Sequence, residues 1–214
     1  GGAGSSFSVP SNYGIGTSDV DDLRTILDAE ELERVSLFGH SSGGATSFVF
    51  AIQSPDRVER AVLLEPTLAA LMPPTEFSRF AKENERIAAV AKNQGYAAGL
   101  NAAVSSAGGE AWAQLDEQVK AERLSALSGS SAFAGPHLLS LNGLRVTEQD
   151  VRNLRVPALL LYGANSFWFE QCIADQFREL RPDIRVVTIE DAGHNVHRDQ
   201  ADTVNTETLS FLGA

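Results

Sequence analysis

Four short, continuous apolar runs alternate with helical segments along this chain, and this alternation limits the possible folds more than any other feature. The runs are Val35–Phe38, Ala61–Glu65, Ala158–Tyr162 and Arg185–Ile189. Strands without an alternating polar face are typical of sheets that are buried on both sides. Strands that alternate with helices form mostly parallel sheets with helices on both faces. The sequence therefore predicts an α/β fold with a mostly parallel sheet.

A long segment between the second and third runs interrupts this alternation. Residues 66–153 show no convincing strand pattern, and their helical stretches are separated by Gly and Ser. An all-helical insertion between two parallel strands is expected to lie as a lid over the C-terminal edge of the sheet. We therefore divide the chain into a core part at 1–65, a helical lid at 66–153 and a second core part at 154–214. The helices expected in the lid cover 75–92, 109–127 and 132–141.

The stretch Gly39–Gly43 has the sequence GHSSG and directly follows the first apolar run. It matches the G-x-S-x-G pattern, in which a sharp turn between a strand and a helix holds a serine above the sheet. A strand is expected before it and a helix after it, so Ser41 is predicted to be a nucleophile rather than part of a plain turn. The N–H of Ser42 is predicted to serve an oxyanion hole, because free donors and the dipole at a helix start favour an anion. His40 is expected to pack against neighbouring elements.

The composition excludes several classes of partner. With 17 Lys and Arg against 28 Asp and Glu, the chain carries a net charge of −11. This argues against nucleic acid and against an anionic membrane surface, because both favour clustered basic residues. No apolar run approaches the ~20 residues of a transmembrane helix, and the start of the chain lacks a signal-peptide pattern. No Cys, His or carboxylate cluster has metal-ligand spacing. The single cysteine, Cys172, fits a reducing compartment, so we expect a cytoplasmic protein without metal or cofactor.

Together these features resemble the α/β-hydrolase superfamily of serine hydrolases. The resemblance covers nearly the whole chain: the FGHSSGG turn, a strand, a helical lid, the segment VPALLLYGANS, and the loop DAGHNVH before a closing helix. In this family the general base is a histidine in the loop after the last strand, and the resemblance assigns that role to His194. A histidine suits the role because its ordinary pKa lies near neutrality. His197 is the rival base and is expected to support the loop or contact substrate, whereas His137 is expected to pack within the lid.

The acid of the triad departs from the commoner family pattern. Most relatives carry an aspartate three residues after the glycine that ends the third strand, and after Gly163 that position holds Ser166. Glu170 follows in a predicted helix and is expected to be solvated. Glu65 ends the second strand at the edge of the sheet, where a carboxylate is costly unless it is paired. Zearalenone-type lactonases and small bacterial esterase-like members resemble this chain in taking a glutamate from that strand end, so the resemblance favours Glu65 as the acid.

The lid indicates the character of the substrate only coarsely. Trp112 is the preferred substrate contact, because pockets between a lid and a core favour large aromatic side chains. Phe167, Trp168 and Phe169 directly follow Ser166 and are expected to form part of the same wall. Other apolar residues that belong to the lid core or line an apolar pocket are Leu71, Met72, Phe77, Phe80, Phe133, Leu138 and Leu139.

The resemblance also implies a segment that precedes this chain. A complete family member has about four further strands before the first run, and the second oxyanion donor comes from a loop in that part. We therefore expect an N-terminal segment of the same protein to be a partner of this chain. Without that segment, one edge of the sheet is expected to be unpaired.

The sequence thus predicts a serine hydrolase that cleaves an apolar carboxylic ester or lactone without a cofactor, through Ser41, His194 and Glu65. Two alternatives stay open, namely a carbon–carbon bond hydrolase with the same triad and a ligand-binding relative with little turnover. The sequence does not distinguish an ester from a lactone, and it defines neither the substrate nor the oligomeric state.

Overall fold

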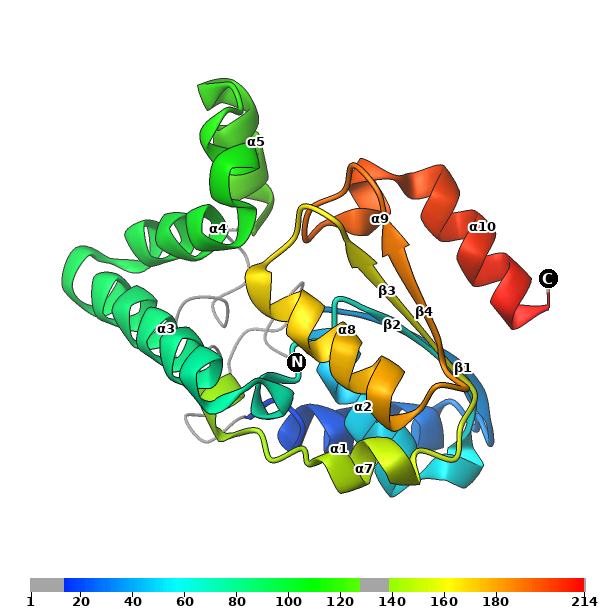
Figure 1. Ribbon diagram of the computed structural model, residues 1–214. Coiled ribbons are helices and arrows are strands. Elements are labelled where there is room, and N and C mark those ends of the chain that lie inside the picture. The colour runs from blue at the N-terminus through cyan, green and yellow to red at the C-terminus, as the bar shows by residue number, and fades with distance from the viewer. Residues whose placement is uncertain (1–13, 128–138, 214) are drawn as a thin grey trace.

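The computed structural model describes residues 14–127 and 139–213, and its described part contains one four-stranded sheet (Figure 1). The strands lie in the order β1-β2-β3-β4, and all neighbours pair in parallel. They are β1 (Val35–His40), β2 (Val58–Leu64), β3 (Ala158–Gly163) and β4 (Arg185–Ile189). Each strand overlaps one of the four predicted apolar runs, so the predicted α/β fold with a parallel sheet is confirmed.

The register of the sheet aligns the C-terminal ends of neighbouring strands. His40 pairs with Leu64, and Leu64 pairs with Leu161. Ser41 and Glu65, which follow β1 and β2, therefore lie at the same edge of the sheet and one strand apart.

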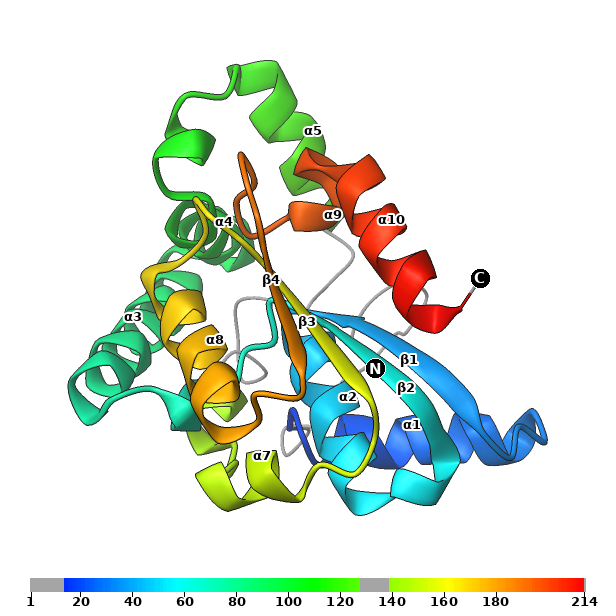
Figure 2. The same ribbon diagram turned by 45° about the vertical axis from the view of Figure 1, so that its right-hand side comes forward.

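Helices cover both faces of the sheet, and the buried apolar side chains form a cluster on each face. Leu63 of β2 belongs to the first cluster, whereas its neighbours Val62 and Leu64 belong to the second. The first face is covered by α1 (Ser18–Ala29), α2 (Ser42–Gln53), α7 (Glu148–Asn153) and α8 (Trp168–Leu180). The second face is covered by α9 (Val196–Asp199) and α10 (Ala201–Leu212). Figure 2 shows the sheet with α8 on one side and α10 on the other. Burial on both faces explains why the strands read as continuous apolar runs.

The segment between β2 and β3 is helical, as predicted, and no strand occurs among its described residues. Figure 1 shows α3, α4 and α5 grouped on the side of the molecule where α8 begins. This group corresponds to the segment that we expect to act as a lid. The elements of the segment before α7 are the 3₁₀ turn η2 (Ala69–Leu71), α3 (Pro74–Gln94), α4 (Tyr96–Ala113), α5 (Glu117–Leu127) and the 3₁₀ turn η3 (Leu141–Gly143).

The start of α4 was not predicted from the sequence. The helix begins at Tyr96, and its 18 residues include seven Ala, the best helix former, beside three Gly, a poor one. Ile87 of α3 and Ala103 of α4 form a small buried apolar cluster between the two helices. Packing against α3 therefore adds to the helix propensity of the alanines and offsets the cost of the glycines.

Three further helices differ from the expectation or lie outside its test. The helix expected at 109–127 is divided by a turn at 114–116 into α4 and α5. α7 belongs to the segment expected to form the lid, but its Val151 is fully buried in the first apolar cluster of the core. The helix expected at 132–141 lies mostly outside the described residues. Among the helices that the structure describes, none has the length and apolar character needed to cross a bilayer.

Candidate active site

Ser41 lies in a sharp turn between β1 and α2, as the GHSSG pattern predicts. Its backbone has φ 56° and ψ −119°. Such a conformation costs a residue with a Cβ roughly 1–3 kcal/mol of strain. Small neighbours make the turn possible. A Cβ at Gly39 would lie only 2.3 Å from the carbonyl oxygen of Gly43. A Cβ at Gly44 would lie 2.9 Å from the Cα of Pro66, so a glycine at this position allows α2 to pack closely against the chain after β2.

Hydrogen bonds fix this turn to the end of β2. The N–H of Ser41 donates to the carbonyl oxygen of Leu64 at 2.9 Å. The N–H of Thr67 donates to the carbonyl oxygen of Ser41 at 3.2 Å, and the two hydroxyl oxygens lie 3.4 Å apart. Thr67 is buried and lines the same cavity as Ser41. Sequence reasoning missed Thr67, and the one signal for it was its place two residues after Glu65.

Ser42 is the first residue of α2. The first N–H groups of a helix have no acceptor within the helix, so the N–H of Ser42 is available to a ligand as far as the helix is concerned. The positive end of the helix dipole lies at the same point. The structure thus places Ser42 as the sequence predicts, directly after the turn that holds Ser41.

Glu65 and His194 form a hydrogen-bonded pair at the edge of the sheet. Glu65 is fully buried, and Nδ1 of His194 donates to its Oε2 at 2.6 Å. The N–H of Gly163 donates to Oε1 at 2.6 Å, and the hydroxyl of Ser166 donates to Oε2. Since a carboxylate only accepts hydrogen bonds, Nδ1 carries the proton of the neutral imidazole and Nε2 carries none. This is the tautomer in which Nε2 can accept a proton.

Ser166 occupies the position where the family resemblance expects an aspartate. Its hydroxyl binds the same oxygen of Glu65 that accepts the Nδ1 proton of His194. The ends of β2 and β3 therefore meet at one point beside the imidazole. A carboxylate from the end of β2 can therefore reach the same side of the imidazole as an acid from the end of β3.

Ser41 and His194 line one cavity of about 840 Å³. This volume lies within the usual range for small-molecule sites. The cavity extends from the sheet edge to α3 and α4, and many of the α3 side chains that line it are polar or charged. Its apolar lining residues are Phe80, Ile87, Ala103, Leu141, Phe167, Trp168 and Phe169.

Phe167, Trp168 and Phe169 form an aromatic wall of this cavity, as the sequence predicts. The rings of Phe167 and Phe169 stack with 4.7 Å between their centroids. The ring of Phe167 also contacts the imidazole of His194 at 4.9 Å, in an edge-to-face arrangement. The aromatic wall therefore begins directly beside the histidine.

Trp112 is buried in α4, but it is not among the described residues that line the cavity. Its role as a substrate contact stays a prediction. Of the lid residues that were considered for an apolar pocket, Phe80 lines the cavity, whereas Phe133 and Leu138 lie outside the described residues. The described residues of that set that do not line it are Leu71, Met72, Phe77 and Leu139.

Two further histidines, His40 and His197, lie near His194. Nε2 of His40 donates to the carbonyl oxygen of His194 at 2.8 Å, and the His40 ring lies 4.7 Å from both the His194 and the His197 rings. Burial, followed by the nearby His194, lowers the pKa of His40 to about 3. His40 is therefore neutral near pH 7 and holds the loop that carries His194. Burial also lowers the pKa of His197. His137, expected to pack in the lid, lies outside the described residues.

Comparison with known proteins identifies the family to which this site belongs. Residues 1–201 match the family model described as the alpha/beta hydrolase fold. The chain belongs to the α/β-hydrolase family. Carboxylesterase YbfK of Bacillus subtilis is 26% identical over 200 residues, which cover 89% of this chain and 61% of that relative. The 2-hydroxy-6-oxo-2,4-heptadienoate hydrolase of Pseudomonas putida is 31% identical over 152 residues, which cover 71% of this chain and 53% of that relative.

Solved structures of other proteins share this fold. A bromoperoxidase from Bacillus anthracis superposes with a TM-score of 0.78 at 21% identity, covering 100% of this chain and 79% of that chain. The crystal structure of carboxylesterase CesB (YbfK) from Bacillus subtilis superposes with a TM-score of 0.66 at 25% identity, covering 92% and 66%. The chain spans less than two thirds of the length of the two sequence relatives above.

Glu170 is buried, so the expectation that it is solvated is wrong. It is 1% exposed in the first turn of α8, and its Oε1 has no hydrogen-bond partner within the described part of the chain. Burial, and then the charge of Glu65, hold the pKa of Glu170 well above its usual range. Glu170 thus keeps its proton where an ordinary glutamate would ionise, and Glu65 is the carboxylate that binds His194.

Glu65, Glu170 and His194 are also the one group of potential metal ligands among the residues that the structure describes, with ligand atoms within 4.8 Å of one another. However, Nδ1 of His194 and Oε2 of Glu65 already share a proton at 2.6 Å. A metal ion would have to displace that proton and separate the pair. The arrangement therefore fits a proton-bridged pair better than a metal centre.

We expect the free energy of unfolding of the full-length α/β hydrolase to depend on the proton of Glu170. Burial holds the pKa of this group well above its ordinary value of 4.5, so the folded state keeps a proton that the unfolded chain loses near that pH. The folded state then holds the extra proton, so stability is lost as the pH rises from that value towards the raised pKa, by up to about 1.4 kcal/mol per pH unit. Glu170→Gln should remove this contribution, and urea unfolding between about pH 5 and 9 measures it.

Glu179→Gln is the matched control for this experiment, because Glu179 lies exposed on the same helix. Titrating groups remote from both glutamates contribute equally to all three proteins, and the control shows the effect of removing an exposed glutamate from the same helix. If the Glu170→Gln and wild-type stabilities keep a constant difference over the whole pH range, Glu170 does not hold an extra proton in the folded state.

Proposed function

We propose that the full-length protein is a cofactor-independent serine hydrolase that cleaves a carboxylic ester or lactone. In this proposal Ser41 is the nucleophile, His194 the general base and Glu65 the acid. One observation carries it: the Nδ1 proton of His194 is held by buried Glu65 at 2.6 Å, and the same histidine lines one cavity with Ser41. The similarity to carboxylesterase YbfK supports an ester substrate.

The geometry suits a two-step acyl transfer. The hydroxyl oxygen of Ser41 attacks the carbonyl carbon while Nε2 of His194 takes the hydroxyl proton. The same nitrogen then gives this proton to the leaving alkoxide, so an alcohol leaves and Ser41 carries the acyl group. Water, deprotonated by Nε2, attacks the acyl group, and the proton returns to Ser41 as the acid leaves. Glu65 keeps the imidazole in the required tautomer and stabilises its cation.

The developing negative charge on the carbonyl oxygen needs donors. In the proposal the N–H of Ser42 supplies one of them, because it lies at the start of α2 directly after the nucleophile. The aromatic wall beside His194 would receive the apolar part of the substrate, since Phe167 contacts both Phe169 and the imidazole.

A carbon–carbon bond hydrolase that uses the same three residues is the second candidate. It is favoured by the 31% identity to the 2-hydroxy-6-oxo-2,4-heptadienoate hydrolase of Pseudomonas putida. The two candidates share Ser41, so they differ in the bond that breaks rather than in the nucleophile. Product analysis with an ester and with a carbon–carbon substrate of similar shape distinguishes them.

A fluorophosphonate probe tests the proposal on the full-length protein. The probe should form a covalent bond to Ser41, which peptide mass spectrometry locates, and His194→Ala should greatly slow the labelling. An activated ester such as p-nitrophenyl butyrate should be hydrolysed by the same preparation. Absence of labelling in a folded preparation would favour a ligand-binding relative with little turnover.

A further inference from the structure

The face of α3 that lines the cavity is positively charged. Arg79, Lys82 and Arg86 follow one another at helical spacing and all line the cavity, together with one carboxylate, Glu83. The chain as a whole has a net charge of −11. This wall therefore carries an excess of two positive charges, although the net charge of the chain is negative.

Arg86 and Glu83 neutralise each other. The guanidinium of Arg86 donates to both oxygens of Glu83, at 2.8 and 2.7 Å. This hydrogen bond to Arg86 is the main reason why the pKa of Glu83 lies below its usual range. The pair leaves Arg79 and Lys82 as the cations whose charge a ligand could balance.

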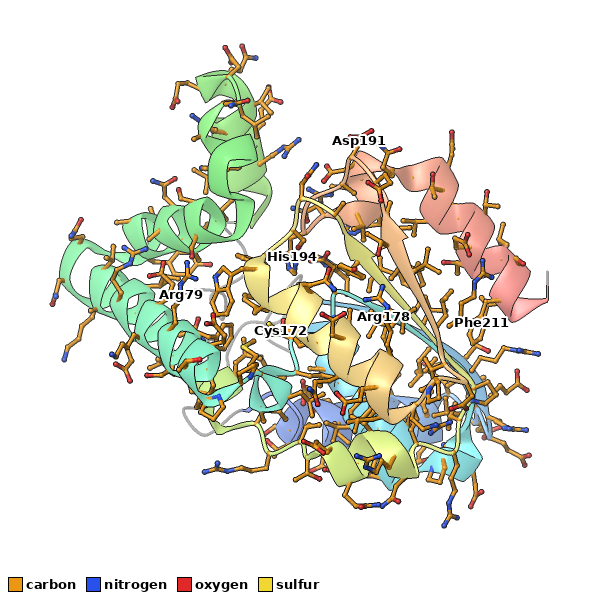
Figure 3. The ribbon with its side chains drawn as sticks, viewed as in Figure 1. Arg79, Cys172, Arg178, Asp191, His194 and Phe211 are labelled. Atoms are coloured by element: carbon orange, nitrogen blue, oxygen red, sulfur yellow. The ribbon has the colours of Figure 1, made fainter. Side chains whose placement is uncertain are left out.

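Arg79 is held in place without a carboxylate. Its guanidinium carbon lies 4.4 Å from the centroid of the Trp168 ring, and Figure 3 shows Arg79 reaching from α3 towards α8. Stacking on an aromatic face orients a guanidinium but leaves the N–H groups at its edge free to donate. Within the described part of the chain, neither Arg79 nor Lys82 has an acidic partner within 4.0 Å.

The stacked ring connects this cationic pair to the site of the chemistry. Trp168 contacts Phe169 at 5.3 Å, Phe169 stacks on Phe167, and Phe167 contacts His194. Figure 3 labels Arg79 and His194, which line one cavity on different elements. A continuous aromatic surface thus runs from the imidazole to the guanidinium.

We propose that the substrate is amphipathic: an ester or lactone whose acyl part carries a carboxylate remote from the bond that is cleaved. Arg79 and Lys82 bind that carboxylate, and the aromatic wall binds the apolar spacer between the two ends. A carboxylate matches the planar fork of an arginine, which can donate two parallel hydrogen bonds. This inference rests on the proposed hydrolase function, and it replaces a wholly apolar substrate by a monoester of a dicarboxylic acid or an acid-bearing lactone.

A pair of substrates of equal length tests the inference on the full-length protein. Mono-p-nitrophenyl adipate ends in a carboxylate, whereas p-nitrophenyl hexanoate ends in a methyl group. The wild-type kcat/KM should be at least about tenfold higher for the adipate ester, because charge-assisted hydrogen bonds are among the stronger ones. Added salt should reduce this preference.

Arg79→Gln and Lys82→Gln should each lower the ratio of the two kcat/KM values, Arg79→Gln by about tenfold. Both side chains are exposed, so neither change removes a core contact. Lys92→Gln is the matched control, because Lys92 is an exposed lysine of the same helix that is not among the described residues lining the cavity. Its ratio should equal that of the wild type.

The outcomes separate this inference from the proposed function. Hydrolysis of the hexanoate ester without a preference for the adipate ester would overturn the inference and leave the hydrolase proposal intact. If neither ester is cleaved, calorimetric titration with monomethyl adipate, which carries one carboxylate, and with methyl hexanoate, which carries none, decides the inference independently. Tighter binding of monomethyl adipate that Arg79→Gln abolishes would support it, and equal dissociation constants in wild type and variant would overturn it.

Discussion

Replacing Ser41 with alanine should abolish the hydrolysis of activated esters by the full-length protein. Loss of the nucleophile removes the covalent step, and turnover should fall by about 10⁶-fold, or roughly 8 kcal/mol of barrier. The fold should persist, because the contact given up by the hydroxyl is the 3.4 Å approach to Thr67. Steady-state and burst kinetics with p-nitrophenyl butyrate measure the rate, and circular dichroism confirms the fold.

Ser41→Gly is the matched control for this change. The φ of 56° at this position strains any residue with a Cβ, whereas glycine adopts positive φ readily. Both variants should be inactive, and the glycine variant should resist urea better than the alanine variant. Wild-type burst kinetics in either variant would show that another group attacks the substrate. A lower stability of the glycine variant would contradict the strained turn.

The strands were predictable because burial on both faces leaves a continuous apolar signature. The ends of the strands were harder to predict than the strands themselves. The second apolar run begins at Ala61, but β2 begins at Val58 and includes Glu59 and Arg60. Arg60 pairs with Ser36 of β1. The pairing of backbone groups with a neighbouring strand thus extends β2 through polar residues that carry no apolar signal.

The residues of the candidate site also differ in how well the sequence predicts them. Ser41 follows from a local turn sequence, whereas the role of His194 follows from the family resemblance, which places the base in the loop after the last strand. Glu65 stands out because a carboxylate ends an apolar strand. The contact of Thr67 with Ser41 and the cationic pair on α3 depend on which elements come together in space. The one local signal for Thr67 is its place two residues after Glu65, and no local pattern marks the cationic pair.

The burial of Glu170 could have been predicted from the sequence. Ile173, Ala174 and Phe177 lie three, four and seven residues after it, and all four are buried in α8. This is the spacing of one helix face. The prediction of a solvated Glu170 followed from its charge alone. Helical periodicity predicts that Glu170 is buried. Burial leaves a neutral carboxyl group beside the carboxylate that binds His194.

Glu65→Gln should lower turnover by about 10⁴-fold, or roughly 5 kcal/mol of barrier, with little loss of stability. The N–H of Gly163 donates to Oε1, so the new amide must place its NH₂ group towards His194. Two donors would then meet at Nδ1, and the imidazole avoids this by carrying its proton on Nε2 instead. In that tautomer Nε2 cannot accept the proton of Ser41, and no carboxylate stabilises the imidazolium. Steady-state kinetics on the full-length protein measure the loss.

Ser166→Ala and Glu170→Gln are the matched controls, because each changes a neighbour of the same carboxylate. Each should cost less than about tenfold, or ~1.4 kcal/mol of barrier. Ser166 donates one of the three hydrogen bonds that Glu65 accepts, and Glu170 already holds its proton. Ser166→Asp in the Glu65→Gln background should recover part of the rate, because Ser166 and His194 meet at one oxygen of Glu65. Nearly full activity of Glu65→Gln, together with an inactive Glu170→Gln, would instead identify Glu170 as the acid.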